Sequence, residues 1–201
     1  MKTQIIIIHG GDTFATHEEY LTFLGNYEIE SLDYFRKKGW KSSLQEKLGE
    51  SFDVIIPKMP CKINAKYKDW KIWFEKLSPL LNDEVILIGH SLGGIFLAKY
   101  LSENDFSKKI LSLHLVAAPY DEETSQESLV DFALSKTVES LPKRADKIFL
   151  YHSQDDLVVP FVDVEKYQRD LPSAKLIVFE DRGHFNQEEF PELVKRVKNC
   201  L

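Results

Sequence analysis

Six short segments of the chain are built mainly from consecutive apolar residues, and each is bounded by charged residues or turn signals. Because neither face of such a segment is polar, the pattern is typical of strands that are covered on both sides of a sheet. The predicted strands span residues 5–8, 53–56, 84–88, 110–116, 147–151 and 175–179.

Between these segments, apolar residues recur at intervals of three and four, which is the spacing of one helix face. The pattern predicts helices near residues 67–81, 95–102, 125–141, 161–170 and 190–201, and mostly helical structure over 17–50, with breaks at Gly25-Asn26 and Gly39. Strands that alternate with helices predict an α/β fold: a three-layer sandwich with a mostly parallel sheet of about six strands and helices on both faces. No repeat, low-complexity segment or linker is found, so we expect one domain over residues 1–201.

Composition narrows the class of protein further. The 201 residues are 43% apolar and 29% charged, with a net charge of −6 and no basic run, which argues against nucleic-acid binding. The first apolar run is too short for a signal peptide, and no stretch approaches the length of a membrane span. The two cysteines, Cys61 and Cys200, have no metal-ligand spacing and no disulfide framework. We therefore expect a soluble cytoplasmic protein that acts on a small molecule, with no membrane partner.

The sequence Gly89-His90-Ser91-Leu92-Gly93-Gly94 directly follows the predicted strand 84–88 and precedes a predicted helix. Gly-x-Ser-x-Gly in this position is typical of a nucleophile elbow, a strained turn that raises the serine hydroxyl above the edge of a sheet. Glycines two residues before and after the serine allow close approach of the backbone. Ser91 is therefore the candidate nucleophile.

A serine hydroxyl needs a base, and the base needs an orienting carboxylate. In a chain with this elbow the order is serine, acid, histidine. His114 falls inside a strand and His152 precedes the candidate acids, so His184, after the last strand, is the candidate base. Asp155 and Asp156 both follow the strand 147–151, and either one could be the acid.

Acyl transfer also needs hydrogen-bond donors for the developing oxyanion. The backbone N–H of Leu92 is one candidate, and the loop after the first strand should supply the other. We choose Gly11 there, with Asp12 and Thr13 as alternatives, and we expect His9 to be structural. The sequence contains no His-Glu-x-x-His, Cys-x-x-Cys, Walker or Gly-x-Gly-x-x-Gly motif, so we expect no metal or other cofactor.

Together these motifs resemble the α/β-hydrolase superfamily over nearly the whole chain, from His9-Gly10-Gly11 to Gly183-His184-Phe185. Within it, the chain resembles the small, lidless serine hydrolases of the retinoblastoma-binding protein 9 family. The resemblance implies a triad of Ser91, Asp156 and His184, with Asp156 preferred because Asp-x-Val-x-Pro is the usual loop after the acid. Two features depart from the pattern: no leading hairpin precedes the first strand, and residues 20–50 are long enough to form a small flap near the site.

The resemblance implies hydrolysis of a small ester, thioester or amide through an acyl-enzyme. Short acyl groups are favoured over long lipids, because the chain has no cap domain and no long apolar segment to cover a substrate. Two other functions remain open: an acyltransferase or perhydrolase that uses the same triad, and a binding module of hydrolase descent that no longer turns substrate over. A nucleotide-binding protein is disfavoured because no phosphate loop is found.

Overall fold

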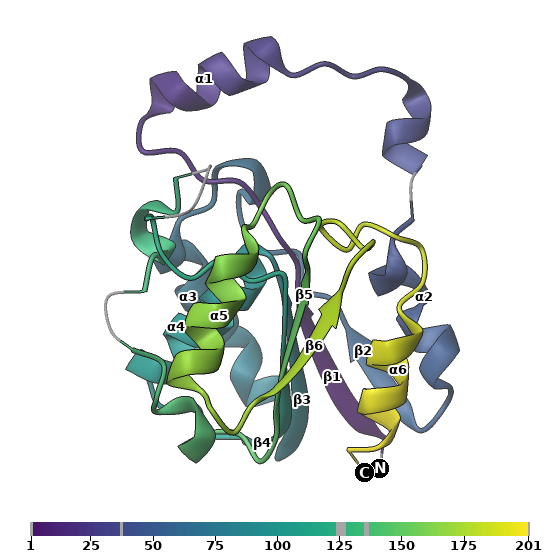
Figure 1. The fold of residues 1–201 in the computed structure, drawn as a ribbon. Coiled ribbons are helices and arrows are strands. Elements are labelled where there is room, and N and C mark those ends of the chain that lie inside the picture. The colour runs from purple at the N-terminus through teal and green to yellow at the C-terminus, as the bar shows by residue number, and fades with distance from the viewer. Residues whose placement is uncertain (1, 37, 124–127, 135–136, 201) are drawn as a thin grey trace.

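A parallel β-sheet forms the centre of the protein (Figure 1). The computed structural model describes residues 2–36, 38–123, 128–134 and 137–200. Within these residues, a six-stranded sheet has the order β2-β1-β3-β4-β5-β6, and every neighbouring pair is parallel. Its strands are β1 (Thr3–Ile8), β2 (Phe52–Ile55), β3 (Glu84–His90), β4 (Lys109–Val116), β5 (Ile148–Ser153) and β6 (Lys175–Phe179). The six predicted strands are thus confirmed, with small shifts at their ends.

Helices cover both faces of this sheet. One face packs against α3 (Tyr67–Leu77), α4 (Leu92–Glu103) and α5 (Phe161–Asp170). The other face packs against α2 (Trp40–Leu48) and α6 (Pro191–Lys198). The predicted three-layer α/β architecture is therefore confirmed.

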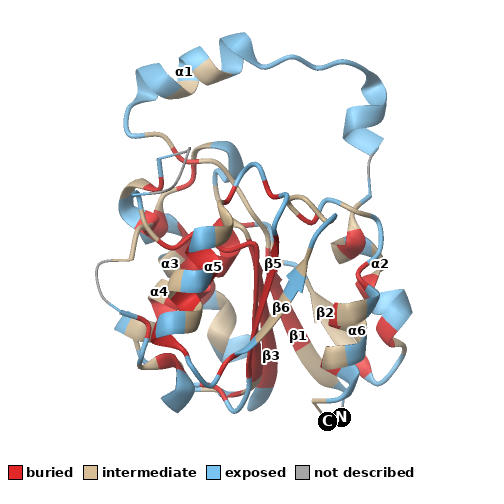
Figure 2. Cartoon of the chain, in the orientation of Figure 1, coloured by how far each residue is buried: buried red, intermediate tan, exposed pale blue. Residues whose placement is uncertain are grey.

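The first strand shows why its apolar run is continuous. Ile6 and Ile8 belong to the core under α3 and α4, whereas Ile5 and Ile7 belong to the core under α2 and α6. All four side chains are completely buried, because successive residues of a strand point to opposite faces and both faces are covered (Figure 2). Each buried isoleucine contributes about 1.5–3 kcal/mol relative to an exposed one.

The order of the strands identifies one edge of the sheet as the place for a site. From β1 the chain passes to β2 on one side, and then returns to β3 on the other side. The carboxyl ends of β1 and β3 are therefore a topological switch point, where the loops that follow the two strands diverge and leave a crevice. The loop after β1 and the serine turn after β3 both begin there.

The prediction of a helix over 125–141 is wrong for the part of it that the structure describes; residues 124–127 and 135–136 lie outside that part. Residues 130–132 and 141–143 form single 3-10 turns instead. In this part, carboxylates from outside the predicted helix bind backbone N–H groups that a helix would have used. Glu122 accepts from Leu129 and Val130 at 2.7 Å, and Asp170 accepts from Val138 at 3.4 Å.

A long segment leaves the body of the protein after β1. It contains α1 (His17–Asn26) and the 3-10 helix η1 (Leu32–Arg36), and it arches above the carboxyl edge of the sheet before it rejoins the body at α2 (Figure 1). No residue of α1 or η1 is buried (Figure 2). The mostly helical character predicted for residues 17–50 is confirmed for the described residues of this range, which contain α1, η1 and α2. Among the described residues, no helix is both long and apolar enough to cross a membrane.

Candidate active site

Ser91 sits in a strained turn between β3 and α4. Its φ of 55° and ψ of −126° lie in a region that side chains with a Cβ rarely adopt, at a cost of about 1–3 kcal/mol. Two backbone hydrogen bonds hold the turn: the Ser91 N–H donates to Val116 at 2.9 Å, and the Gly94 N–H donates to Ser91 at 2.7 Å. The turn thus presents Ser91 at the carboxyl edge of the sheet, as the elbow motif predicts.

The glycines of the motif are required by the close approach of the backbone. A Cβ on Gly89 would lie 2.4 Å from the carbonyl oxygen of Gly93, and a Cβ on Gly93 would lie 2.2 Å from that of Ile8. Both distances are far below van der Waals contact. Any side chain at either position would therefore push α4 away from the sheet and move Ser91.

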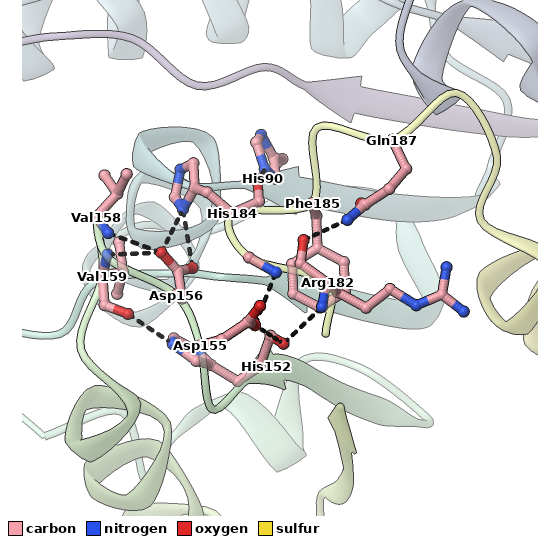
Figure 3. Close-up of polar contacts among 12 residues, drawn as sticks. His90, His152, Asp155, Asp156, Val158, Val159, Arg182, His184, Phe185 and Gln187 are labelled. Atoms are coloured by element: carbon pink, nitrogen blue, oxygen red, sulfur yellow. Dashed lines mark hydrogen bonds and ion pairs between the residues drawn. The ribbon is translucent and has the colours of Figure 1, made fainter. Parts of the chain in front are cut away.

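His184 and Asp156 meet at the same edge (Figure 3). The Nδ1 of His184 lies 2.9 Å from Oδ2 and 3.2 Å from Oδ1 of Asp156. Since a carboxylate can only accept, Nδ1 carries a proton and donates it to Asp156. In the neutral form of the ring, a proton on Nδ1 leaves Nε2 as the acceptor, which is the tautomer that a general base requires.

Asp156 is held as a carboxylate. Burial alone would raise its pKa, but the hydrogen bond and charge of His184 and the N–H groups of Val159 and Val158 hold the pKa of Asp156 below its ordinary value. The two N–H groups donate to Oδ1 at 3.0 and 2.9 Å. The side chain is fully buried, so its orientation toward His184 is fixed by the loop.

Asp155 has a different environment from its neighbour. It is exposed, and its Oδ1 accepts from the Ser153 hydroxyl at 2.5 Å and from the Gly183 N–H at 2.8 Å. These contacts lower the pKa of Asp155, the Ser153 bond having the larger effect. Asp155 therefore ties the loop of β5 to the loop that carries His184, while Asp156 makes the contact with the imidazole.

His90 is a residue whose role sequence analysis missed. Its ring is buried, its Nε2 donates to the carbonyl oxygen of His184 at 2.9 Å, and the two ring centroids are 5.0 Å apart. Burial lowers the pKa of His90 well below its ordinary value, so this ring stays neutral. His90 thereby links the serine turn to the His184 loop. The sequence carries no signal for this, because any residue can occupy that position of the motif.

The remaining histidines near the core make hydrogen bonds that support the fold, as expected for His9. His9 accepts from the Met59 N–H at 3.0 Å, and His114 is hydrogen-bonded to Tyr151 and Ser112 inside the sheet. His152 donates to the carbonyl oxygen of Val159 at 2.9 Å and so supports the loop of Asp156.

The hydroxyl of Ser91 is not hydrogen-bonded to His184 or to any other residue that the structure describes. His184 packs on the ring of His90, which immediately precedes Ser91 in the chain. The structure therefore brings Asp156 and His184 into direct contact and links the serine turn to them through His90.

Both predicted oxyanion donors border the serine. Gly11, Ser91 and Leu92 line a small hollow of about 20 Å³. The N–H of Leu92 begins α4, where the first N–H groups of a helix lack partners within it. Gly11 must be a glycine, because a Cβ there would lie 2.5 Å from the carbonyl oxygen of Lys62. The N–H of Asp12, an alternative donor, is engaged with that same oxygen at 2.9 Å.

The other alternative, Thr13, also lines the hollow, and its hydroxyl donates to the carbonyl oxygen of Ser128. Among the described residues, no group of three or more histidine, cysteine or carboxylate side chains is arranged to hold a metal ion.

Comparison of the structure with solved structures identifies the class of fold. The structure of the ydeN gene product from Bacillus subtilis superposes with a TM-score of 0.79 at 18% identity, covering 99% of this chain and 98% of that one. The meta-cleavage product hydrolase CumD from Pseudomonas fluorescens IP01 superposes with a TM-score of 0.66 at 15% identity, covering 98% and 90%. The fold is that of the α/β hydrolases.

Sequence comparison then identifies the family. A model of the serine hydrolase family matches residues 32–196, and the chain belongs to that family. The serine hydrolase RBBP9 of Rattus norvegicus is 27% identical over 202 residues, covering 100% of this chain and 95% of that protein. The resemblance to the retinoblastoma-binding protein 9 family is thus confirmed.

Proposed function

We propose that the protein hydrolyses small esters, thioesters or amides through an acyl-enzyme formed on Ser91. The observation that carries the proposal is the 2.9 Å contact between Nδ1 of His184 and Asp156, which orients the imidazole so that Nε2 of its neutral form can act as a base. Membership of the serine hydrolase family supports the same conclusion.

In the proposed reaction, the Ser91 hydroxyl rotates toward Nε2 of His184 and gives up its proton as its oxygen attacks the substrate carbonyl. Asp156 holds the imidazole in orientation and stabilises the imidazolium that forms. The N–H groups of Leu92 and Gly11 stabilise the oxyanion, and each contributes about 3 kcal/mol to lowering the barrier. The imidazolium protonates the leaving group, and water then attacks the acyl-enzyme with His184 again as base.

Hydrolysis of p-nitrophenyl acetate by the parent and by Ser91→Ala tests this proposal. We expect the parent to turn the ester over and Ser91→Ala to lose activity with its circular dichroism spectrum unchanged. Equal activity of the two proteins would refute the role of Ser91. Added methanol separates hydrolysis from acyl transfer, because an acyltransferase would form methyl acetate in preference to acetate.

One observation favours a second candidate function. The absence of a hydrogen bond between Ser91 and His184 in the described structure fits a binding module that has kept the arrangement of a hydrolase without its turnover. In active hydrolases, however, this bond often forms only with substrate present. A folded parent protein that releases no p-nitrophenol would favour the binding module.

A further inference from the structure

A large cavity lies beyond the hollow at Ser91. It has a volume of about 1,020 Å³ and extends between α1 and the loop that follows β1. Cavities that hold small organic ligands have volumes of about 300–1,000 Å³, so this one can take a substantial part of a substrate. Thr13 and Ser128 line both the cavity and the hollow. The two spaces therefore share the pair Thr13 and Ser128, in which the Thr13 hydroxyl donates to the Ser128 carbonyl oxygen.

One wall of the cavity is aromatic. Phe14, Phe23 and Tyr27 line it, with ring centroids 5.1 Å apart for Phe14 and Phe23 and 5.3 Å apart for Phe23 and Tyr27. The ammonium group of Lys66 donates to the carbonyl oxygen of Phe14 at 2.7 Å and anchors the start of this wall to the body of the protein. Such a row of packed rings offers apolar surface to a ligand rather than hydrogen bonds.

The charged groups of the cavity are all acidic. Asp12, Glu18, Glu19 and Glu28 line it, and no lysine, arginine or histidine is among its described lining residues. Burial raises the pKa of Asp12, against the opposing charge of Lys62. An anionic group placed here would be repelled by the four carboxylates.

We propose that this cavity receives the uncharged aliphatic acyl chain of the substrate, so that the protein prefers octanoyl esters to acetyl esters and rejects acyl chains that end in a carboxylate. This inference rests on the proposed acyl-enzyme at Ser91. We assign the cavity to the acyl part because that part stays attached to Ser91 through both steps, whereas the alcohol leaves after the first. Residues 14–28 thus supply cover for the acyl chain although the protein has no cap domain, the feature whose absence favoured short acyl groups in the sequence analysis.

The test compares p-nitrophenyl octanoate with p-nitrophenyl acetate in the parent, Phe23→Ala and Leu24→Ala. Leu24 is the matched control, because it lies on the same helix, is 41% exposed and does not line the cavity. We expect kcat/KM of the parent to favour octanoate by at least about tenfold, Phe23→Ala to lower that ratio about tenfold, and Leu24→Ala to leave it unchanged. Equal ratios in the two variants, or a parent that prefers acetate, would overturn the proposal.

Further substrates test the charge and the orientation. Mono-p-nitrophenyl suberate has the chain length of the octanoate but ends in a carboxylate, and we expect its kcat/KM at pH 7 to be at least about tenfold lower. Octyl acetate and ethyl octanoate are isomers with alkanol leaving groups of similar reactivity, and they carry the long chain on the alcohol and on the acyl part respectively. A preference for octyl acetate over ethyl octanoate would show that the cavity holds the leaving group instead.

A binding measurement separates failure of this inference from failure of the proposed function. In Ser91→Ala, calorimetric titration with p-nitrophenyl octanoate reports binding without turnover. Binding that Phe23→Ala weakens would support the cavity even if the parent hydrolyses nothing. Hydrolysis of acetate by the parent, together with binding of octanoate that Phe23→Ala leaves unchanged, would refute the cavity and leave the proposed function standing.

Discussion

Replacing Asp156 by asparagine tests the geometry of the candidate triad at its most constrained point. Oδ1 of Asp156 accepts from the N–H groups of Val158 and Val159 at 2.9 and 3.0 Å, while Oδ2 faces Nδ1 of His184 at 2.9 Å. An asparagine must keep its oxygen toward the two N–H groups, so its NH₂ group faces His184. Nδ1 must then accept, and the ring shifts its proton to Nε2. The imidazole can no longer take the proton of Ser91.

The expected loss follows from that change of tautomer. Losing the correct tautomer and the carboxylate that stabilises the imidazolium lowers kcat by about 10⁴-fold in a serine hydrolase triad. This factor corresponds to about 5.5 kcal/mol of barrier, at about 1.36 kcal/mol for each factor of ten. Because asparagine has nearly the same shape, the fold around the loop stays intact.

The initial rate of p-nitrophenyl acetate hydrolysis measures the loss of kcat in Asp156→Asn, and Asp155→Asn is the matched control. Asp155 contacts Ser153 and Gly183 but not the imidazole, so its substitution should lower kcat by about tenfold or less. Thermal unfolding of both variants checks that they are folded. If Asp156→Asn retained kcat within tenfold of the parent, or if Asp155→Asn were the more damaging change, the assignment of the acid would be wrong.

Three further predictions concern stability and positioning. Burial lowers the pKa of His114 from 6.5 to about 3, so between these two pH values only the unfolded chain binds a proton at this residue. The free energy of unfolding, measured in urea, should therefore fall by up to about 1.4 kcal/mol for each pH unit below pH 6.5. The fall should be less steep in His114→Gln. Gly93→Ala should lower the free energy of unfolding by about 3 kcal/mol or more, because the added methyl group would meet the Ile8 carbonyl oxygen. Gly25→Ala should raise the free energy of unfolding by up to about 1 kcal/mol, because no atom lies within 4 Å of the added Cβ. Equal melting temperatures of the two variants would contradict this prediction. His90→Phe should lower kcat about tenfold with little change in KM, and an unchanged kcat would remove its positioning role.

The sheet could be predicted from the sequence because its signal is local. A run such as Ile5–Ile8 is apolar at every position only if both faces are covered, and the structure buries all four side chains. The described part of residues 125–141 could not be predicted, because side chains from outside it bind its backbone. Glu122 and Asp170 accept from N–H groups that the apolar pattern assigns to a helix.

In the candidate site too, the residues with a local sequence signal could be predicted and those without one could not. Ser91 and His184 stand next to strands in a fixed order, so a pattern could locate them. The choice between Asp155 and Asp156 depends on which carboxylate turns inward, and only the N–H groups of the following loop decide that. The bond from His90 to His184 joins residues 94 positions apart in the chain and has no local signal.

The central claim is that Ser91 is an activated nucleophile with His184 as its base. Labelling with a fluorophosphonate, read by intact mass, tests it most directly in the parent, Ser91→Ala and His184→Ala. We predict that the parent gains one phosphonyl group, that Ser91→Ala gains none and that His184→Ala reacts far more slowly. A folded parent that does not react, or labelling that persists in Ser91→Ala, would contradict the claim.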